Sequence, residues 1–185
     1  MPWIKIIDEN DASETLKSLY AEIEKKRGKL SNIMKIQSLN PDAMKKHMDL
    51  YLTIMFSSSK LTREERELIA VVVSSANHCK YCINHHGEAL DHYWKNKEKV
   101  KKFTQNYRSI TLSNRIDKIL DYVYKLTKTP SELSKADVDV LKNLGISDEE
   151  ILNINLIAGY FNFVNRIALG LGVEFSEDET KGYKC

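Results

Sequence analysis

The sequence predicts an all-α fold, a compact bundle of several helices formed by a single domain over residues 1–185. Apolar residues recur at spacings of three and four along most of the chain, which is the period of a helix that buries one face. Two capping boxes, Thr62 with Glu65 and Ser147 with Glu150, mark helix starts. The strict alternation of apolar and polar residues that is typical of strands is almost absent.

The first helix is expected at residues 11–26, where Asp11 and Glu14 form an acidic start and Gly28 follows the end. Its apolar stripe shares one face of the helix and consists of Ala12, Leu16, Leu19, Tyr20 and Ile23.

A short helical turn is expected at residues 32–38. It is followed by a helix at residues 41–56, because Asn40 is a suitable cap and Pro41 favours the first helical position. The inward face of this second long helix is expected to consist of Met44, Met48, Tyr51, Leu52 and Met55.

The capping box at Thr62 opens the next helix, and the apolar run Leu68–Val73 predicts that this helix is deeply buried. Val71–Val73 is also compatible with a strand, but the cap and the charged first turn favour a helix. The small polar segment Ser74–His78 predicts a break. A new helix is expected over Cys79–His92, with the cysteines in its first turn.

Four further helices are expected from their apolar periodicity, at residues 97–105, 113–126, 135–143 and 148–171. Pro130 and Gly145 separate the later ones. The lysine-rich stretch Lys95–Lys102 is interpreted as a solvated helix face, because short clusters of one charge are common on helix surfaces.

Composition narrows the function classes. With 185 residues and 42% hydrophobic content, the chain is long enough for one substantial core. Twenty-eight basic and 26 acidic residues leave a net charge of +2, so charge suggests neither nucleic-acid binding nor recruitment to acidic lipid. Three cysteines do not form a disulfide framework in a chain of this length.

A cytoplasmic location is expected, because charged residues occur early within residues 1–12 and this segment does not resemble a secretory signal. The most apolar segment, Ile151–Val173, reads as a buried helix rather than a membrane span. It is interrupted by Asn153, Asn155, Asn162, Asn165 and Arg166. Cys185 is interpreted as an incidental exposed thiol.

The most informative motif places Cys79 and Cys82 three residues apart, with His86 one turn beyond the second. Three chemistries fit this spacing. Zinc needs four ligands, and the candidates for the missing one are His78, His85 and His92. Buried structural cysteines are the second possibility. The third, a redox dithiol, is favoured because the two thiols lie within disulfide reach and a base lies beside one of them.

The segment LTREERELIAVVVSSANHCKYCINHHGEAL, residues 61–90, and the later FNFVNRIALGLGVE, residues 161–174, carry a family resemblance. The chain resembles the alkyl hydroperoxidase D-like, carboxymuconolactone decarboxylase superfamily, and specifically its peroxidase-related branch. The matching pattern is a glutamate twelve residues before CxxC and a histidine four residues after it. The resemblance implies a compact multi-helix alkyl hydroperoxidase D-like domain over the whole chain.

The resemblance further implies a thiol-dependent peroxidase or disulfide oxidoreductase. Cys82 would be the peroxidatic cysteine and Cys79 the resolving one, with Glu67 and His86 as a proton relay. No metal or organic cofactor is expected. The implied partners are a hydroperoxide substrate and a dithiol reductant, such as a lipoyl domain or a thioredoxin-like protein. The family also implies a homo-oligomer, a dimer, trimer or hexamer. The alternatives are a non-enzymatic redox-sensing thiol switch and a carboxymuconolactone-type decarboxylase.

Two features of the motif carry structural expectations. Tyr81 stands where the best-studied family members have a histidine. A phenol does not accept a proton at neutral pH as imidazole does, so Tyr81 is expected to shape a pocket. Glu67 lies twelve residues before Cys79, about 18 Å along an unbroken helix, so the relay requires a bend near Asn77.

Other polar residues have less definite expectations. His85 is expected to face solvent or an oligomer contact, and His47 and His92 have no partner that the sequence reveals. Polar groups on an apolar helix need hydrogen bonds, so a further set is expected to cap neighbouring elements or bridge subunits. This set consists of Asn162, Asn165 and Arg166.

Overall fold

The computed structural model describes residues 2–180, and it confirms the all-α fold. The predicted role of Cys185 lies outside the described residues. The α-helices are α1 (Glu14–Arg27), α2 (Asn32–Lys35), α3 (Pro41–Phe56), α4 (Arg63–Ala76), α5 (Lys80–Trp94), α6 (Lys97–Gln105), α7 (Asn114–Lys128), α8 (Lys135–Asn143) and α9 (Asp148–Gly170). Short 3-10 turns are η1 (Glu9–Asp11), η2 (Tyr107–Ser109), η3 (Pro130–Glu132) and η4 (Glu177–Thr180).

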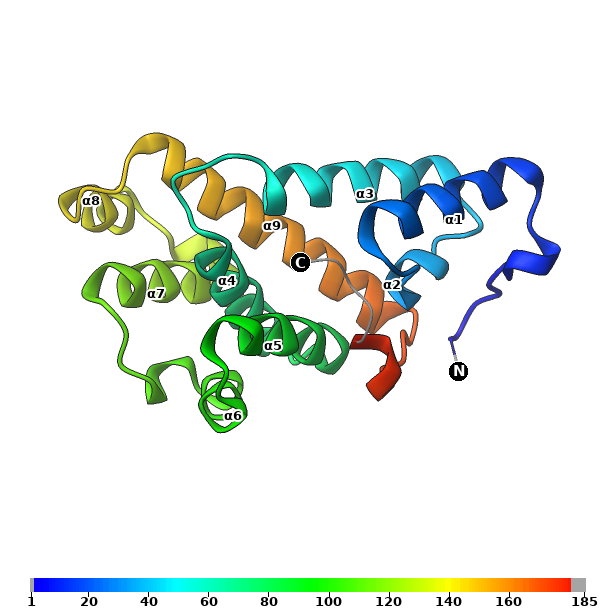
Figure 1. Ribbon diagram of the computed structural model, residues 1–185. Coiled ribbons are helices and arrows are strands. Elements are labelled where there is room, and N and C mark those ends of the chain that lie inside the picture. The colour runs from blue at the N-terminus through cyan, green and yellow to red at the C-terminus, as the bar shows by residue number, and fades with distance from the viewer. Residues whose placement is uncertain (1, 181–185) are drawn as a thin grey trace.

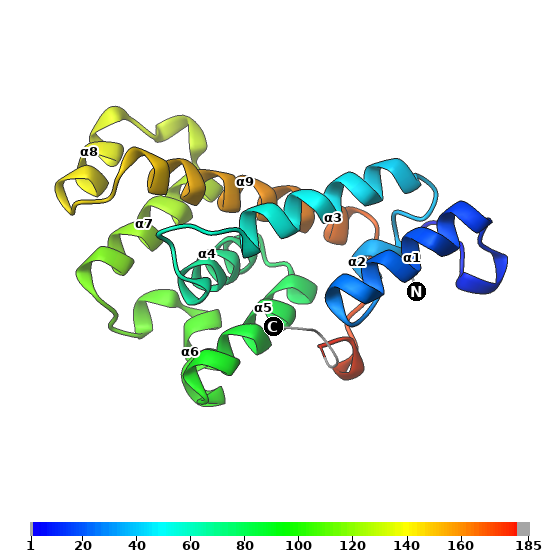
Figure 2. The ribbon, with the colours of Figure 1, turned by 45° about the horizontal axis from the view of Figure 1, so that its top comes forward.

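The helices are arranged around the long helix α9, which runs across the molecule beside α3 (Figures 1 and 2). Helix α4 packs against α5, α7 and α9 and occupies the centre of the bundle. Helices α7 and α8 lie at one end and α1 and α2 at the other. The last described turn, η4, lies against α5.

The helix boundaries follow the sequence signals closely, with one correction. α1 begins after Ser13, whose hydroxyl accepts a hydrogen bond from the N–H of Leu16 at 3.3 Å, so the predicted start at Asp11 is wrong. Serine is a favoured N-cap, whereas Asp11 belongs to the preceding 3-10 turn. Gly28 ends α1 in the left-handed conformation at φ 85°, as a glycine does readily.

Helix α4 confirms the predicted deep burial. Every residue of Leu68–Val73 is at most 3% exposed, so the three valines belong to a buried helix and not to a strand. Arg66 on the same helix is also buried, at 4% exposed. Its guanidinium donates to the carbonyl oxygens of Ile54, Ser57 and Leu61 at 2.8–3.2 Å. This arginine therefore ties the loop between α3 and α4 to the core.

Both predicted capping boxes are present, and one arginine joins them. Arg115 of α7 donates to Glu65 at the start of α4, and to Glu150 at the start of α9 at 2.9 Å. The two most buried helices are therefore linked at their N-terminal ends by a single guanidinium.

Trp3 closes the opposite end of the bundle. The backbone N–H of Trp3 donates to the carbonyl oxygen of Leu171 at 3.0 Å, and the indole ring of Trp3 covers Gly172. Gly172 has φ +64°, and a Cβ atom at this position would lie 2.6 Å from the indole ring. Only glycine fits both conditions.

The lysine-rich stretch is a solvated helix face, as predicted, with Lys97, Lys101 and Lys102 exposed on α6. Across residues 2–180, no helix combines the length and the apolar character that crossing a membrane requires.

Candidate active site

The break between α4 and α5 brings the motif together. α4 ends at Ala76, and the chain turns through Asn77 and through His78, which has a left-handed φ of 57°. The side chain of Asn77 donates to the side-chain oxygens of Asn162 and Asn165 of α9 at 2.9 and 3.0 Å. The predicted bend is confirmed, and these two asparagines cap the turn as expected of polar groups on α9.

The two thiols lie at the start of α5. Cys79 is its N-cap, Cys82 lies in its first turn, and both are at most 2% exposed. Both are free cysteines whose Sγ atoms lie 2.8 Å apart. The hydrogen bond between the sulfurs lowers the pKa of Cys79 and, together with burial, raises the pKa of Cys82 well above its usual value. The pair therefore loses one proton readily and resists losing the second.

Glu67 and His86 form a buried carboxylate–imidazole pair. Glu67 is 0% exposed, and its Oε2 lies 2.7 Å from Nδ1 of His86. Its Oε1 accepts from Nη2 of Arg63 at 2.5 Å. Burial alone raises the pKa of Glu67, but the interactions with His86 and Arg63, including the hydrogen bond to His86, outweigh it, so the pKa is lowered. Glu67 is therefore ionised, although it lies in the core.

A cavity of about 350 Å³ opens beside this pair. Glu67, His86 and Cys82 line it, whereas Cys79 is not among its lining residues. Its apolar and aromatic walls include Met34, Met48, Tyr51, Tyr160, Phe161 and Val164. Phe161 also packs edge-on against the His86 ring, with centroids 4.5 Å apart. Of the two thiols, Cys82 is therefore the one that a molecule in the cavity meets.

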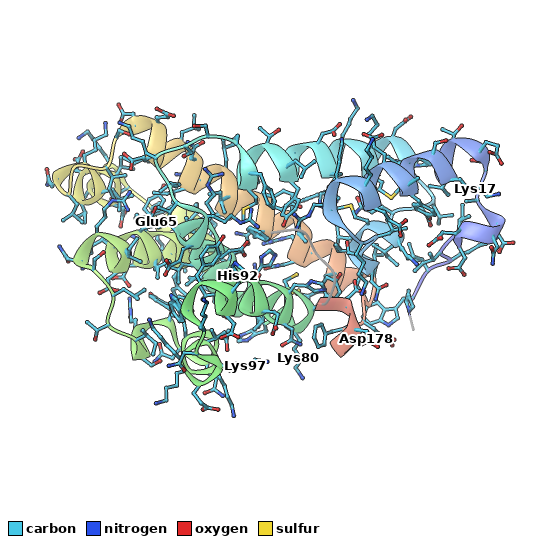
Figure 3. All side chains as sticks on the ribbon, in the orientation of Figure 1. Lys17, Glu65, Lys80, His92, Lys97 and Asp178 are labelled. Atoms are coloured by element: carbon cyan, nitrogen blue, oxygen red, sulfur yellow. The ribbon has the colours of Figure 1, made fainter. Side chains whose placement is uncertain are left out.

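Tyr81 lines the same cavity, which agrees with the expectation that it shapes a pocket. Its hydroxyl donates to Oε1 of Glu179 at 2.8 Å and accepts from the N–H of Ile33 at 3.2 Å. Glu179, at 4% exposed, also accepts from the N–H of Asn32 at 2.6 Å. Tyr81 thus fastens the C-terminal turn and α2 to the start of α5. Figure 3 shows the neighbouring Asp178 near that end of α5.

The expectation that His85 faces solvent is wrong. It lines the cavity, packs edge-on against Phe175, and its Nε2 lies 3.8 Å from Glu179. Burial lowers the pKa of His85 to about 3, so it is neutral at pH 7. The cause is the C-terminal segment, which covers a helix face that the sequence alone would leave in solvent. His92 lines the cavity from α5 and is exposed (Figure 3).

Several cavity residues carried no recognisable sequence signal. Arg27, at the end of α1, lies with its guanidinium carbon 5.2 Å from the ring centroid of Tyr51. Tyr160 of α9 also lines the cavity, and a 2.7 Å hydrogen bond joins its side chain to that of His47 of α3, which lies outside the cavity lining. Only the spacing of His47 and Tyr51, one helical turn apart, could have indicated a shared polar face.

An all-α bundle with a buried CxxC at a helix start, and a carboxylate–imidazole pair beside it, is the arrangement that the resemblance to alkylhydroperoxidase D-like proteins implies. Residues 41–102 match the carboxymuconolactone decarboxylase family. The matched segment contains the CxxC motif, and the match confirms the resemblance inferred from the sequence. A comparison with curated proteins gives no significant match.

Solved structures support the same assignment. The chain is 26% identical to a peroxidase-related protein with an alkylhydroperoxidase AhpD core from Ralstonia eutropha JMP134, covering 97% of this chain and 94% of that one, with a TM-score of 0.86. A peroxidase-related protein from Silicibacter sp. TM1040 is 28% identical over 99% and 93%, with a TM-score of 0.83. The debrominase Bmp8, 22% identical over 94% and 92% with a TM-score of 0.76, shares the fold.

Proposed function

We propose that the protein is a thiol-dependent peroxidase, or disulfide oxidoreductase, that reduces hydroperoxides through the Cys79–Cys82 dithiol. One observation carries this proposal: Cys82 lines a cavity together with the Glu67–His86 pair, and Cys79 lies 2.8 Å behind it. A nucleophile, a base with an orienting carboxylate, and a resolving thiol are the groups that this reaction needs.

Glu67 sets the chemistry of His86. Because the carboxylate accepts the Nδ1–H, the lone pair of the neutral ring is on Nε2, and the carboxylate stabilises the imidazolium that forms when Nε2 takes a proton. His86 thus removes the proton from Cys82, and the resulting thiolate attacks the terminal oxygen of the hydroperoxide. The S–O bond forms as the O–O bond breaks, which gives Cys82 sulfenic acid and, with the proton from His86, an alcohol or water.

Cys79 completes the turnover. Its sulfur attacks the Cys82 sulfenic acid, a disulfide forms, and water leaves. The two electrons that restore the dithiol come from an external dithiol, and a lipoyl domain or a thioredoxin-like protein is the proposed donor. Cys79 is the more acidic thiol, which suits this step, since it is the thiolate that attacks. Access to the cavity, not acidity, assigns the first attack to Cys82.

The roles of the cysteines can be separated by serine variants. Cys82→Ser should abolish peroxide consumption. Cys79→Ser should consume about one equivalent of peroxide and stop at a sulfenic acid that dimedone traps at Cys82 and mass spectrometry locates. Cys185→Ser is the matched control and should retain turnover. Turnover that persists in Cys82→Ser would contradict the proposal.

The alternatives are tested in the same experiment. A redox-sensing switch predicts that oxidation of the dithiol changes partner binding or assembly without turnover with any dithiol reductant. A carboxymuconolactone-type decarboxylase predicts activity that survives both cysteine variants, since decarboxylation does not need the dithiol. Release of bromide from a bromopyrrole, the class of compound bound by a variant of the debrominase Bmp8, is measured in parallel.

A further inference from the structure

A second hydrogen-bonded chain ends at the same cavity, and the peroxidase chemistry described above does not use it. It runs from Gln37 through His47 of α3 to Tyr160 of α9. His47 is 4% exposed and Tyr160 is 6% exposed. Nε2 of His47 lies 2.7 Å from the Tyr160 hydroxyl, and Nδ1 of His47 lies 2.8 Å from Nε2 of Gln37. A buried polar chain of this kind needs a donor for every acceptor along it.

The direction of this chain depends on how its first member, Gln37, contacts the His47 ring. The amide nitrogen of Gln37 donates one hydrogen to the carbonyl oxygen of Ile33 at 2.7 Å, which orients the amide group. Nδ1 of His47 lies 2.8 Å from this amide nitrogen and 3.0 Å from Oε1 of the same side chain, so the tautomer of the ring decides which contact is the hydrogen bond. When Nδ1 accepts along the shorter contact, the ring hydrogen is on Nε2 and donates to the Tyr160 oxygen. Burial lowers the pKa of His47 to about 4, so the ring is neutral at pH 7. In this tautomer the hydroxyl hydrogen of Tyr160 remains for another acceptor.

Tyr160 belongs to the same cavity as the reacting groups. Tyr160 lines the cavity with Cys82, and its ring stacks on that of Tyr51 at 5.8 Å between centroids. Burial raises the pKa of Tyr160 well above 10, and the charges of Tyr51 and Cys82 raise it further while that of Arg27 lowers it. The phenol thus stays protonated and lies within electrostatic reach of the attacking sulfur.

We infer that the Tyr160 hydroxyl, positioned by His47, donates a hydrogen bond to the oxygen that leaves when Cys82 attacks a hydroperoxide. This inference rests on the proposed function. As the O–O bond breaks, negative charge develops on the leaving oxygen, which His86 protonates, while Tyr160 keeps its own proton. A donor placed where charge develops lowers the barrier. The help is largest for alkyl hydroperoxides and hydrogen peroxide, whose leaving oxygens are strongly basic. Peroxycarboxylic acids, which release a weakly basic carboxylate, gain little.

The test compares two classes of oxidant in single-turnover reactions of the reduced full-length protein. Tyr160→Phe should slow the reaction with tert-butyl or cumene hydroperoxide by on the order of 10²-fold, as loss of an oxyanion donor does. The rate with peracetic acid should change much less. Tyr122→Phe is the matched control, because it removes a buried hydroxyl that accepts from Asn155 outside the cavity, and it should leave both rates unchanged.

A second variant tests the donor chain without removing the phenol. In Gln37→Glu, a carboxylate accepts from Nδ1 of His47 and moves the ring's lone pair to Nε2, which then accepts the Tyr160 hydrogen. The variant should reproduce the selective loss of the alkyl hydroperoxide rate with the folded structure retained by circular dichroism.

The outcomes distinguish this inference from the proposed function. If Tyr160→Phe slows both oxidants equally, or slows neither, the inference is overturned and the peroxidase proposal stands. An unchanged ratio of the two rates in Gln37→Glu overturns the direction of the donor chain. If the wild-type dithiol reacts with neither oxidant, both proposals are overturned together.

Discussion

Replacement of Glu67 by glutamine tests the proposed relay most directly, because the change removes one charge and keeps the shape of a fully buried side chain. Glu67 accepts from His86 at 2.7 Å and from Arg63 at 2.5 Å. A hydrogen bond to a charged group contributes about 1.5–3 kcal/mol. If the bond to His86 stabilises the imidazolium by that amount in the transition state, Glu67→Gln should slow oxidation of Cys82 about 10- to 150-fold.

His86→Ala removes the base itself and should cost more, about 10²- to 10⁴-fold. Because Glu67 acts through His86, the double variant should react no more slowly than His86→Ala alone. The assay is stopped-flow oxidation of the reduced protein by excess hydroperoxide, followed by the number of free thiols that remain.

Stability needs a matched control, since Glu67→Gln leaves Arg63 without its carboxylate. Glu150→Gln serves this purpose. Glu150 is 7% exposed and pairs with Arg115 at 2.9 Å, far from the cavity lining. The Glu150→Gln substitution should lower the free energy of unfolding and leave the oxidation rate unchanged. A folded Glu67→Gln variant that reacts at the wild-type rate would refute the relay and return Glu67 to a purely structural role.

Three further predictions concern the scaffold. Arg66→Leu leaves three buried carbonyl oxygens without their donor and should lower the free energy of unfolding by at least about 2 kcal/mol in urea titrations. Gly172→Ala places a Cβ against Trp3 at positive φ and should cost about 1–2 kcal/mol, and a melting temperature equal to wild type would contradict the packing. Stability should fall as the pH drops from 6.5 to about 4, because the unfolded chain binds protons that buried His47 does not. The loss for this residue is about 3 kcal/mol, and His47→Gln should remove this part of the pH profile in calorimetry.

Local signals predicted most of the fold. The capping boxes at Thr62 and Ser147 and the cap at Asn40 each open the expected helix, because a capping side chain bonds N–H groups within its own first turn. The one wrong start, at Asp11, arose where two capping candidates stand two residues apart and only the hydrogen bond of Ser13 distinguishes them. The free-energy difference between two such helix starts is small, and contacts with neighbouring segments decide which one forms.

The candidate site also combines features that the sequence predicted with features that only the tertiary structure shows. The sequence by itself determined the thiol spacing and the need for a bend near Asn77, because both follow from helix geometry. The pairing of Glu67 with His86 was implied by the family resemblance of the sequence. Only the tertiary structure decided that Cys82 reaches the cavity, that Glu179 covers His85, and that His47 meets Tyr160. The contacts of His85 and of His47 join segments more than 90 residues apart. All three features depend on how whole helices pack, a property that no local pattern encodes.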